Sequence, residues 1–426
     1  MAQLTVLRNT VLKKSTAAAF LLSAEDKVRL QSGRSLAVES AVRVGRHCRV
    51  KLLQPLSPLG SIGYIPLDHV EVPLDEVRGV WLTNTDSKLL HSRESIQAGF
   101  QRLRQLGFNT VYPVVWQRGF TLYPSSVAAS FIGESVMPNS AYANRDMLAE
   151  VIDAAHEHQL RVIPWFEYGL AAPPGSQLAQ RQAALLTLDS TGNPIRTKRT
   201  DGKPDFFVWL NPCQPRVKQF LVGLISDVIT RYPVDGIQLD DHFGFPVELG
   251  YDPLTQDLYR QEHRGRPMPS QATNPQRLRW MAKQMTALLR QIHRVVKTQK
   301  GVISLSPNPL GFSKTNYSVD WQAWVQEALI DELVLQVYRD NLGSFIAEIS
   351  KPEIFAVQSR IPTAIGILSG IKTRSVSSSQ MRQQLQEVRR RNLSGVAFFF
   401  YETVLHEQLA PSLVARNPET LSQLFA

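Results

Sequence analysis

The chain has 426 residues, 43% of them hydrophobic and 20% charged, with a formal net charge of +10. These proportions match soluble globular proteins and exclude a disordered chain, and the length suits one large domain with a small module. No apolar run is long enough to span a bilayer, so we expect no membrane span. The sequence shows no clear signal peptide, which favours the cytoplasm.

The basic residues are scattered, with short clusters only at 198–199 and 389–391. This pattern is typical of solvated helix faces, so we expect no nucleic-acid partner. The two cysteines, Cys48 and Cys213, fall in different predicted domains and support neither a disulfide framework nor a metal cluster. We therefore expect no cofactor and no metal ligands, and the oligomeric state stays open.

Residues 1–74 show short strand-like pieces separated by Gly, Ser and Pro. The pieces are Thr5–Leu12, Lys27–Leu30, Ser35–Val38, Cys48–Leu53, Gly63–Ile65 and His69–Val72. This pattern predicts a small all-β module that ends near the junction at residues 73–76.

From residue 75 to residue 426 the pattern changes to strands that alternate with helices. The predicted strands are Arg78–Asn84, Asn109–Trp116, Arg161–Glu167, Val234–Asp240, Val302–Asn308, Asp331–Tyr338, Thr363–Leu368 and Gly395–Glu402. Eight such units predict a (β/α)8 TIM barrel, an α/β fold. A doubly wound open sheet is the competing architecture, but the sequence has no GxGxxG or GxxxxGK turn to support it.

The predicted helices fit between these strands. They are Ser92–Leu106, Arg145–His158, Pro215–Tyr232, Pro275–Lys297, Trp321–Ala328, Leu342–Ser350 and Ser379–Arg391. The longest connections, residues 117–144, 170–211 and 243–274, each follow a strand. We expect them to be unstructured and to wall one cleft at the carboxyl ends of the strands.

The stretch Val234–Pro246, with sequence VDGIQLDDHFGFP, is the centre of the predicted site. Strand alternation places Gln238 and Asp240 on the inner face of the barrel, and Asp241 on the opposite face. A carboxylate on the inner face at the end of a barrel strand indicates chemistry more than structure. Because consecutive residues point in opposite directions, we expect that one ion could not be held by Asp240, Asp241 and His242 together.

Further polar and aromatic residues collect at the predicted strand ends. The polar ones are Asn84, Glu167, Asn308, Tyr338, Asp340 and Glu402, and the aromatic ones include Trp116, Tyr123, Trp165, Trp209 and Phe243. Carboxylates among aromatic platforms are typical of glycosidases, which need one acid, one nucleophile or base, and surfaces that stack on sugars. Aromatic side chains in a barrel can equally be core, and a single acid can simply pair with an arginine.

We assign provisional roles on this basis. Asp240 is the expected nucleophile or base, and the proton donor is expected among Asp241, Glu167, Asp340 and Glu402. The expected hydroxyl-orienting residues are Asn84, His242, Asn308 and Tyr338. A carbohydrate-binding barrel without catalysis and a metal-dependent deacetylase or phosphodiesterase are the alternatives.

Several motifs in order resemble a known family. They are RGVWLTNTDS from Arg78, FNTVYPVVWQRGFTLYPS from Phe108, VIPWFEYG from Val162, VWLNP from Val208, VDGIQLDDHFGFP from Val234, SLSPNP from Ser304, LVLQVYRD from Leu333 and GVAFFFYE from Gly395. Together they resemble the glycosyl-hydrolase-like family ten, in its cyanobacterial branch. The segment that ends GSIGYIPLDHVEV resembles the SH3-like modules of cyanobacterial cell-wall enzymes.

The resemblance implies a barrel with a sugar-hydrolysing site at its strand ends, in which the pair Asp240 and Asp241 matches the family motif. It also implies kinship with the divisome-localised glycoside hydrolase, which cuts peptide-free peptidoglycan strands. The expected partner is therefore a polysaccharide, with peptidoglycan glycan or a related amino-sugar polymer favoured. Such a substrate would place the protein in the periplasm or at the cell wall rather than in the cytoplasm.

Overall fold

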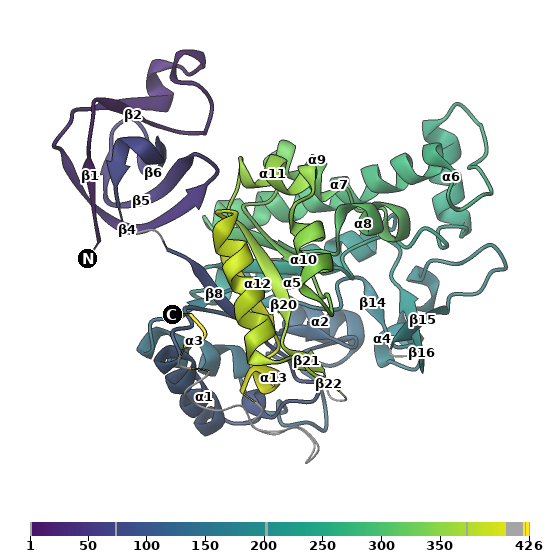
Figure 1. Ribbon diagram of the computed structural model, residues 1–426. Helices are drawn as coiled ribbons and strands as arrows, with labels where there is room; N and C mark the ends of the chain where they lie inside the picture. The colour runs from purple at the N-terminus through teal and green to yellow at the C-terminus, as the bar shows by residue number, and fades with distance from the viewer. Residues whose placement is uncertain are drawn as a thin grey trace.

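The computed structural model describes residues 2–72, 75–200, 203–371, 374–405, 421 and 423–425. Figure 1 shows a small β domain at the N-terminus beside a larger body of strands and helices. Buried hydrophobic side chains form two separate clusters, one in residues 4–70 and one that begins at Val77. The core of the N-terminal domain is therefore distinct from the core of the larger body.

The N-terminal domain is a seven-stranded antiparallel sheet in the order β3-β2-β6-β5-β4-β1-β7. Its strands are β1 (Ala2–Val6), β2 (Thr10–Lys13), β3 (Lys27–Leu30), β4 (Ser35–Val44), β5 (His47–Leu56), β6 (Gly60–Pro66) and β7 (Val70–Glu71). The predicted piece Thr5–Leu12 spans parts of two strands. The all-β content agrees with the sequence, and the SH3-like assignment stays a prediction. Both cysteines are free and buried.

The larger body is built on one curled parallel sheet in the order β12-β9-β8-β23-β20-β19-β18-β17-β13. Its strands are β8 (Val77–Leu82), β9 (Thr110–Pro113), β12 (Arg161–Val162), β13 (Trp165–Phe166), β17 (Gly236–Asp240), β18 (Val302–Ser306), β19 (Glu332–Gln336), β20 (Thr363–Leu368) and β23 (Gly395–Phe399). Every predicted strand is present, most of them shorter than expected.

The two ends of this sheet are consecutive pieces of one extended segment. Arg161 and Val162 pair with β9, whereas Trp165 and Phe166 pair with β17. Pro164, which has no N–H to donate, lies between the two pieces. The sheet therefore curls into a TIM-barrel-like ring, in which residues 161–166 pair with β9 on one side and with β17 on the other.

Helices surround the sheet in Figure 1. They are α1 (Arg93–Gln105), α2 (Ser126–Ile132), α3 (Met147–Glu157), α4 (Gln177–Arg181), α5 (Pro215–Arg231), α6 (Pro253–Glu262), α7 (Pro275–Thr298), α8 (Leu310–Tyr317), α9 (Trp321–Gln326), α10 (Leu342–Ile349), α11 (Pro352–Gln358), α12 (Ser378–Arg390) and α13 (Tyr401–Leu405). All seven predicted helices are present within two residues of their expected ends.

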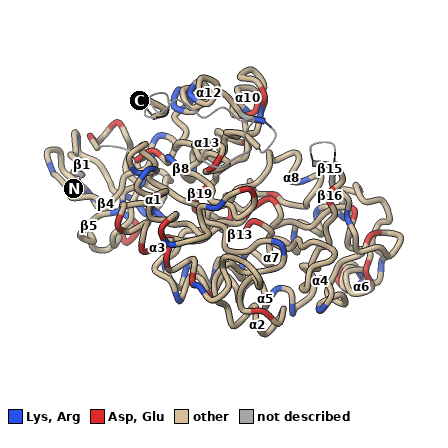
Figure 2. The backbone as a smooth tube through the Cα atoms, turned by 90° about the horizontal axis from the view of Figure 1, so that it is seen from below, with Lys and Arg blue, Asp and Glu red and all other residues tan. Residues whose placement is uncertain are grey.

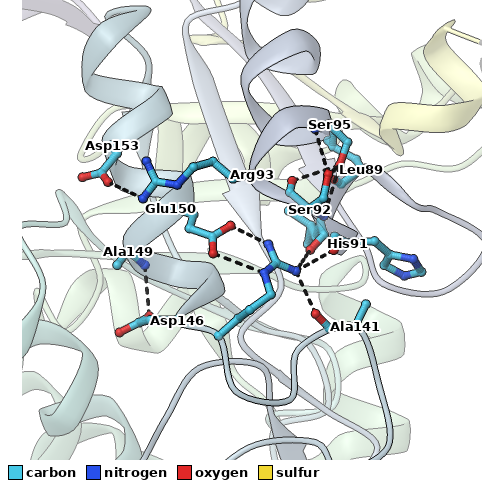
Figure 3. Close-up of polar contacts among 12 residues, drawn as sticks. Leu89, His91, Ser92, Arg93, Ser95, Ala141, Asp146, Ala149, Glu150 and Asp153 are labelled. Carbon is cyan, nitrogen blue, oxygen red and sulfur yellow. Dashed lines mark hydrogen bonds and ion pairs between the residues drawn. The ribbon is translucent and has the colours of Figure 1, made fainter.

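The starts of α1 and α3 are held by side-chain caps and by one arginine. Ser92 and Ser95 form a capping box at α1, and Asp146 accepts from the Ala149 N–H at α3. Arg145 pairs with Glu150, and it donates to the carbonyl oxygens of His91 at 2.6 Å and Ala141 at 2.8 Å. Figure 3 labels these three partners, Glu150, His91 and Ala141. This arginine therefore ties the beginnings of two barrel helices together.

The barrel interior is polar at the level of Gln238. The Trp81 indole N–H donates to Gln238 Oε1 at 2.7 Å, and Gln238 Nε2 donates to Ser304 Oγ at 3.0 Å. Ser304 in turn donates to the buried carboxylate of Glu332, which forms an ion pair with Arg161. The predicted inward orientation of Gln238 is confirmed by these contacts across the ring.

The three long connections are not unstructured, as the sequence led us to expect. They contain α2, α4 and α6, the hairpin β10 (Trp116–Gln117) and β11 (Phe120–Thr121), and a sheet of β14 (Ala171–Ala172), β15 (Arg196–Thr200) and β16 (Lys203–Trp209). A second small hairpin pairs β21 (Gly370–Ile371) with β22 (Arg374–Ser375). These elements are too short for a periodic pattern to stand out in the sequence.

Among the described residues, no helix is both long and apolar enough to cross a bilayer. Figure 2 shows acidic and basic residues interspersed along the described chain rather than gathered on one element. The scattered charge expected from the sequence is thus also scattered in space.

The separate core of the N-terminal domain generates a prediction about folding. Polar contacts join it to the barrel at Asp75, which accepts from the Ala41 N–H at 2.8 Å, and at Ser394, which donates to the Arg43 carbonyl at 3.1 Å. Removal of residues 1–74 should leave a barrel that unfolds in one cooperative transition, with Tm lowered by a few degrees because these contacts are lost. Circular dichroism during heating measures this, and an insoluble or non-cooperative product would contradict two independent domains.

Candidate active site

The site begins at the end of β17. A Cβ at Gly236 would lie 2.1 Å from the Val302 carbonyl oxygen, so glycine is needed where β17 starts beside β18. Four residues later Asp240 ends the strand with its side chain 4% exposed. Gln336, at the end of β19, donates from Nε2 to Asp240 Oδ1 at 2.6 Å and to the Ser306 carbonyl at 2.9 Å. Asp240 therefore faces the barrel interior, as the alternation predicted.

Asp241 does not point toward the helices, which corrects the expectation from strand alternation. The strand ends at Asp240 and the chain turns, with the Phe243 N–H donating to the Asp240 carbonyl at 3.0 Å. Asp241 accepts from Asn308 Nδ2 at 2.8 Å, and its carboxylate lies 3.3 Å from His242 Nδ1. Alternation holds only within a strand, so it gave the wrong face for the first residue beyond it.

The same turn brings three possible metal ligands together. One donor atom each from Asp240, Asp241 and His242 lie within 4.8 Å of one another. Carboxylate oxygens and an imidazole nitrogen are ligands that zinc accepts. The geometric reason for excluding a shared ion was therefore wrong.

Glu167 follows β13, the strand that pairs with β17. Gly169 lets the next residues pass close to His242, because a Cβ there would lie 2.6 Å from the His242 carbonyl. Burial and the nearby charge of Asp241 raise the pKa of Glu167 to about 8, although Gln117 and Arg118 act in the opposite direction. A carboxyl with this pKa holds its proton at neutral pH, as a general acid must.

Asp240 is affected by the same neighbours. Burial raises its pKa well above the usual range, and the charges of Asp241 and Glu167 raise it further. Burial raises the pKa of the Tyr338 phenol, and the nearby charges of Asp240, Asp241 and Glu167 raise it further. Three carboxylates this close cannot all be ionised without mutual repulsion, so the group holds at least one proton at neutral pH.

Two further predicted residues lie at this end of the barrel. Trp165 lies against Asp240 and packs between Trp81 and Phe399, with both ring distances at 6.4 Å. Asn84 follows β8, and its buried Oδ1 has no hydrogen-bond partner among the described residues. An amide in this condition is available to a ligand hydroxyl.

Glu402 is placed elsewhere. It lies in the first turn of helix α13 instead of at the end of a strand, and its carboxylate accepts from the Ser87 hydroxyl at 2.6 Å. It lines a separate cavity of about 250 Å³ with Leu89, Gly99 and Arg102. We therefore leave Glu402 out of the proposed catalytic group.

Several predicted sugar platforms are fully enclosed by protein. Trp116 donates to the Gly169 carbonyl at 2.9 Å, and Tyr123 donates to the Leu224 carbonyl at 3.2 Å. Phe243 is buried against Trp324 of α9, on the helix side of the strand. These rings pack the wall of the barrel, and none has a face left for a sugar.

Trp209 and Asp340 differ from the expectation in opposite ways. Trp209 lies beside the site, 5.8 Å from the His242 ring, but it is fully buried and donates to the Gly244 carbonyl. Asp340 is exposed and forms an ion pair with Arg374 of β22. Trp209 therefore packs against the His242 ring and is not available to a sugar. Asp340 does not belong to the group of Asp240, Asp241 and Glu167.

Two glutamines that contact the site, Gln336 and Gln117, were not predicted from the sequence. Gln336 has the inward phase of its strand, two residues before Tyr338, and the alternation argument used for Asp240 could have found it. Gln117 donates to Thr85 at 2.7 Å, and its side chain acts to lower the pKa of Glu167. It follows a buried tryptophan in a two-residue strand, and no pattern in the sequence marks it.

Comparison with known proteins gives the family. Residues 76–389 match the sequence profile described as glycosyl hydrolase-like 10. The chain belongs to the glycosyl hydrolase-like 10 family. The match begins where the N-terminal sheet ends and includes the strands that carry Asp240, Asp241 and Glu167.

Relatives of this glycosyl hydrolase-like 10 chain include two named bacterial proteins. The glycosyl hydrolase DigH of Escherichia coli is 24% identical over a match of 336 residues, and the match covers 70% of this chain and 72% of DigH. The glycosyl hydrolase YngK of Bacillus subtilis is 22% identical over a match of 294 residues, and the match covers 62% of this chain and 54% of YngK. Both relatives extend beyond the matched segment.

Solved structures support the fold. The glycoside hydrolase domain of PgaB from Bordetella bronchiseptica superimposes with a TM-score of 0.58 at 12% identity, over 83% of this chain and 98% of that one. The catalytic domain of a β-amylase from Paenibacillus polymyxa gives a TM-score of 0.56 at 10% identity, over 83% and 99%. At these identities the glycosyl hydrolase-like 10 chain shares the architecture of these domains, and its site must be argued from its own residues.

The raised pKa of Glu167 predicts that the free energy of unfolding depends on pH. Glutamate has a pKa of about 4.5 without its folded surroundings, so between about pH 4.5 and 8 the folded protein binds a proton that the unfolded chain has lost. The free energy of unfolding should therefore fall as pH rises through this window. Glu167→Gln removes the effect and should stabilise the protein by roughly 1–3 kcal/mol at pH 8 but hardly at pH 4.5.

Urea unfolding of wild type and Glu167→Gln at both pH values measures this difference. An equal free-energy difference at pH 4.5 and pH 8 would mean that Glu167 titrates normally. It would then not be a suitable acid at neutral pH.

Proposed function

We propose that this protein is a glycoside hydrolase that cleaves a polysaccharide, with peptidoglycan glycan strands or a related amino-sugar polymer as substrate. The observation that carries the proposal is the grouping of Asp240, Asp241 and Glu167, from two adjacent barrel strands, with Glu167 protonated at neutral pH. Membership of a glycosyl hydrolase-like family supports the reaction class.

The reaction needs a proton donor and a carboxylate that attacks the sugar or activates water. Glu167 donates its proton to the glycosidic oxygen as the bond to the leaving sugar breaks. In the reactive state the proton of the group is on Glu167, so Asp240 is ionised and acts as nucleophile or base, with its Oδ1 fixed by Gln336 on the inner face of the barrel. Asp241 accepts a hydrogen bond from Asn308, and its charge adds to burial in raising the pKa of both Asp240 and Glu167.

Neighbouring groups are suited to orient the sugar. Burial, and then the charges of Asp240, Asp241 and Glu167, raise the pKa of Tyr338, so it keeps its phenolic proton and can donate to a hydroxyl oxygen. The His242 ring stacks on Tyr168 with ring centres 5.4 Å apart, and its Nδ1 lies 3.2 Å from the Glu167 carbonyl oxygen, which fixes the ring at the edge of the site. Asn84 offers a buried amide oxygen. These groups can read hydroxyl positions without taking part in bond breaking.

The first test is replacement of Asp240. Asp240→Asn keeps the shape of the side chain and removes its charge, so release of new reducing ends from peptide-free peptidoglycan strands should fall by roughly 10²- to 10⁴-fold. The Tm should stay the same or rise, because a buried negative charge is removed. The matched control is Asp340→Asn at the exposed ion pair, which should change turnover less than about 2-fold. Turnover near that of wild type in Asp240→Asn would remove Asp240 from the mechanism.

A metal-dependent deacetylase is the second candidate, and the spacing of Asp240, Asp241 and His242 favours it. In such an enzyme a metal ion would activate water to attack the acetyl group. The hydrolase proposal predicts that EDTA leaves release of reducing ends unchanged. Zinc added afterwards should release no acetate from N-acetylated glycan. Loss of activity in EDTA with recovery in zinc, accompanied by acetate release, would replace the first candidate by the second.

A further inference from the structure

The negative charge of the group Asp240, Asp241 and Glu167 repels an anionic substrate unless a cation lies beside the site. Two arginines near the site are already paired within the protein. Arg196 pairs with Glu248 and lies 4.9 Å from the centre of the Tyr317 ring, and Arg339 pairs with Glu348. Their charges are neutralised by protein carboxylates, so neither is a strong anchor for a substrate charge.

Arg118 is different, because it sits at the tip of the β10–β11 hairpin. Arg118 and Gly119 form the two-residue turn with φ of 53° and 82°. Such turns favour Asn-Gly or Gly-Gly, and a left-handed conformation costs an arginine about 1 kcal/mol. A Cβ at Gly119 would lie 3.2 Å from Leu178 Cβ, so the turn is seated against the start of α4. The turn thus has an arginine at a position where asparagine or glycine would adopt the backbone conformation at lower cost.

This position is beside the proton donor. The Tyr168 N–H donates to the Trp116 carbonyl at 3.3 Å, which sets the hairpin next to Glu167 and Tyr168. The positive charge of Arg118 acts to lower the pKa of both Glu167 and Tyr168, against the larger effect of burial. Arg118 is exposed, and among the described residues it forms no ion pair with a carboxylate. Its fork of donors is therefore open to a ligand.

We propose that Arg118 is a specificity-determining residue that binds a carboxylate carried by the sugar next to the scissile bond. This inference rests on the proposed function and deepens it: the preferred substrate is a glycan with carboxylate-bearing sugars. A guanidinium binds a carboxylate through two parallel hydrogen bonds, and the local negative charge of the three site carboxylates makes that cation necessary.

The chain offers a matched pair of variants for the test. Arg264 and Gly265 form a second Arg-Gly turn with φ of 56° and 80°, exposed and just beyond α6. Asparagine adopts the left-handed conformation more readily than arginine, so Arg118→Asn and Arg264→Asn remove the same charge and relieve the same backbone cost. Only the first variant changes the cation beside Glu167.

The probe is peptide-free peptidoglycan strands, compared with the same strands after their lactyl carboxylates are reduced to alcohols. In wild type, kcat/KM should be higher for the carboxylated strands, and this preference should fall roughly 10-fold or more in Arg118→Asn. Arg264→Asn should keep the wild-type preference, while both variants keep or raise Tm. Persistence of the preference in Arg118→Asn, or its equal loss in Arg264→Asn, would overturn the inference.

Binding of the two polymers, measured by calorimetry in the Asp240→Asn background, separates this inference from the proposed function. If the wild type cuts neither polymer, the proposed function fails, and the binding preference still reports on Arg118. Equal binding of both polymers by a protein that retains Arg118 would overturn the inference even if hydrolysis is observed.

Discussion

Closure of the barrel by residues 161–166 is the constraint on which the site depends. This segment pairs with β9 through Arg161 and Val162 and with β17 through Trp165 and Phe166. The second pairing is parallel and in register, with Phe166 opposite Leu239, so the next residues on the two strands are Glu167 and Asp240. The acid and its partner carboxylate are thus neighbours because the ring closes at this point.

The interior of the ring explains why this register is kept. Arg161 and Glu332 form an ion pair at one end, and hydrogen bonds continue through Ser304 and Gln238 to Trp81. Hydrogen bonds have directions that apolar packing lacks, so a slip of one residue would leave buried polar groups without partners. The polar interior therefore specifies the alignment of the strands that carry the site.

Sequence patterns predicted the parts of this molecule that repeat. Alternation and helical spacing located the eight strands and seven helices, and the inward phase of Gln238 also identified Asp240. They failed where the chain leaves a regular element. Asp241 turns back into the site because the strand ends before it, and Glu402 lies in the first turn of a helix. Trp116 and Tyr123 are enclosed by helices whose packing no local pattern encodes. Gln117 lies in a two-residue strand and Arg118 in the turn that follows it, and these elements are too short to produce a period.

The crowded carboxylates have a consequence for inhibition. A substrate arrives neutral at the sugar ring, but a basic sugar analogue with a protonated ring nitrogen brings a positive charge to the point where Asp240, Asp241 and Glu167 repel one another. Its binding would relieve that repulsion and would displace the proton shared by the group. Tight binding of such a compound is therefore coupled to proton release, and its affinity should increase with pH for as long as the analogue stays protonated.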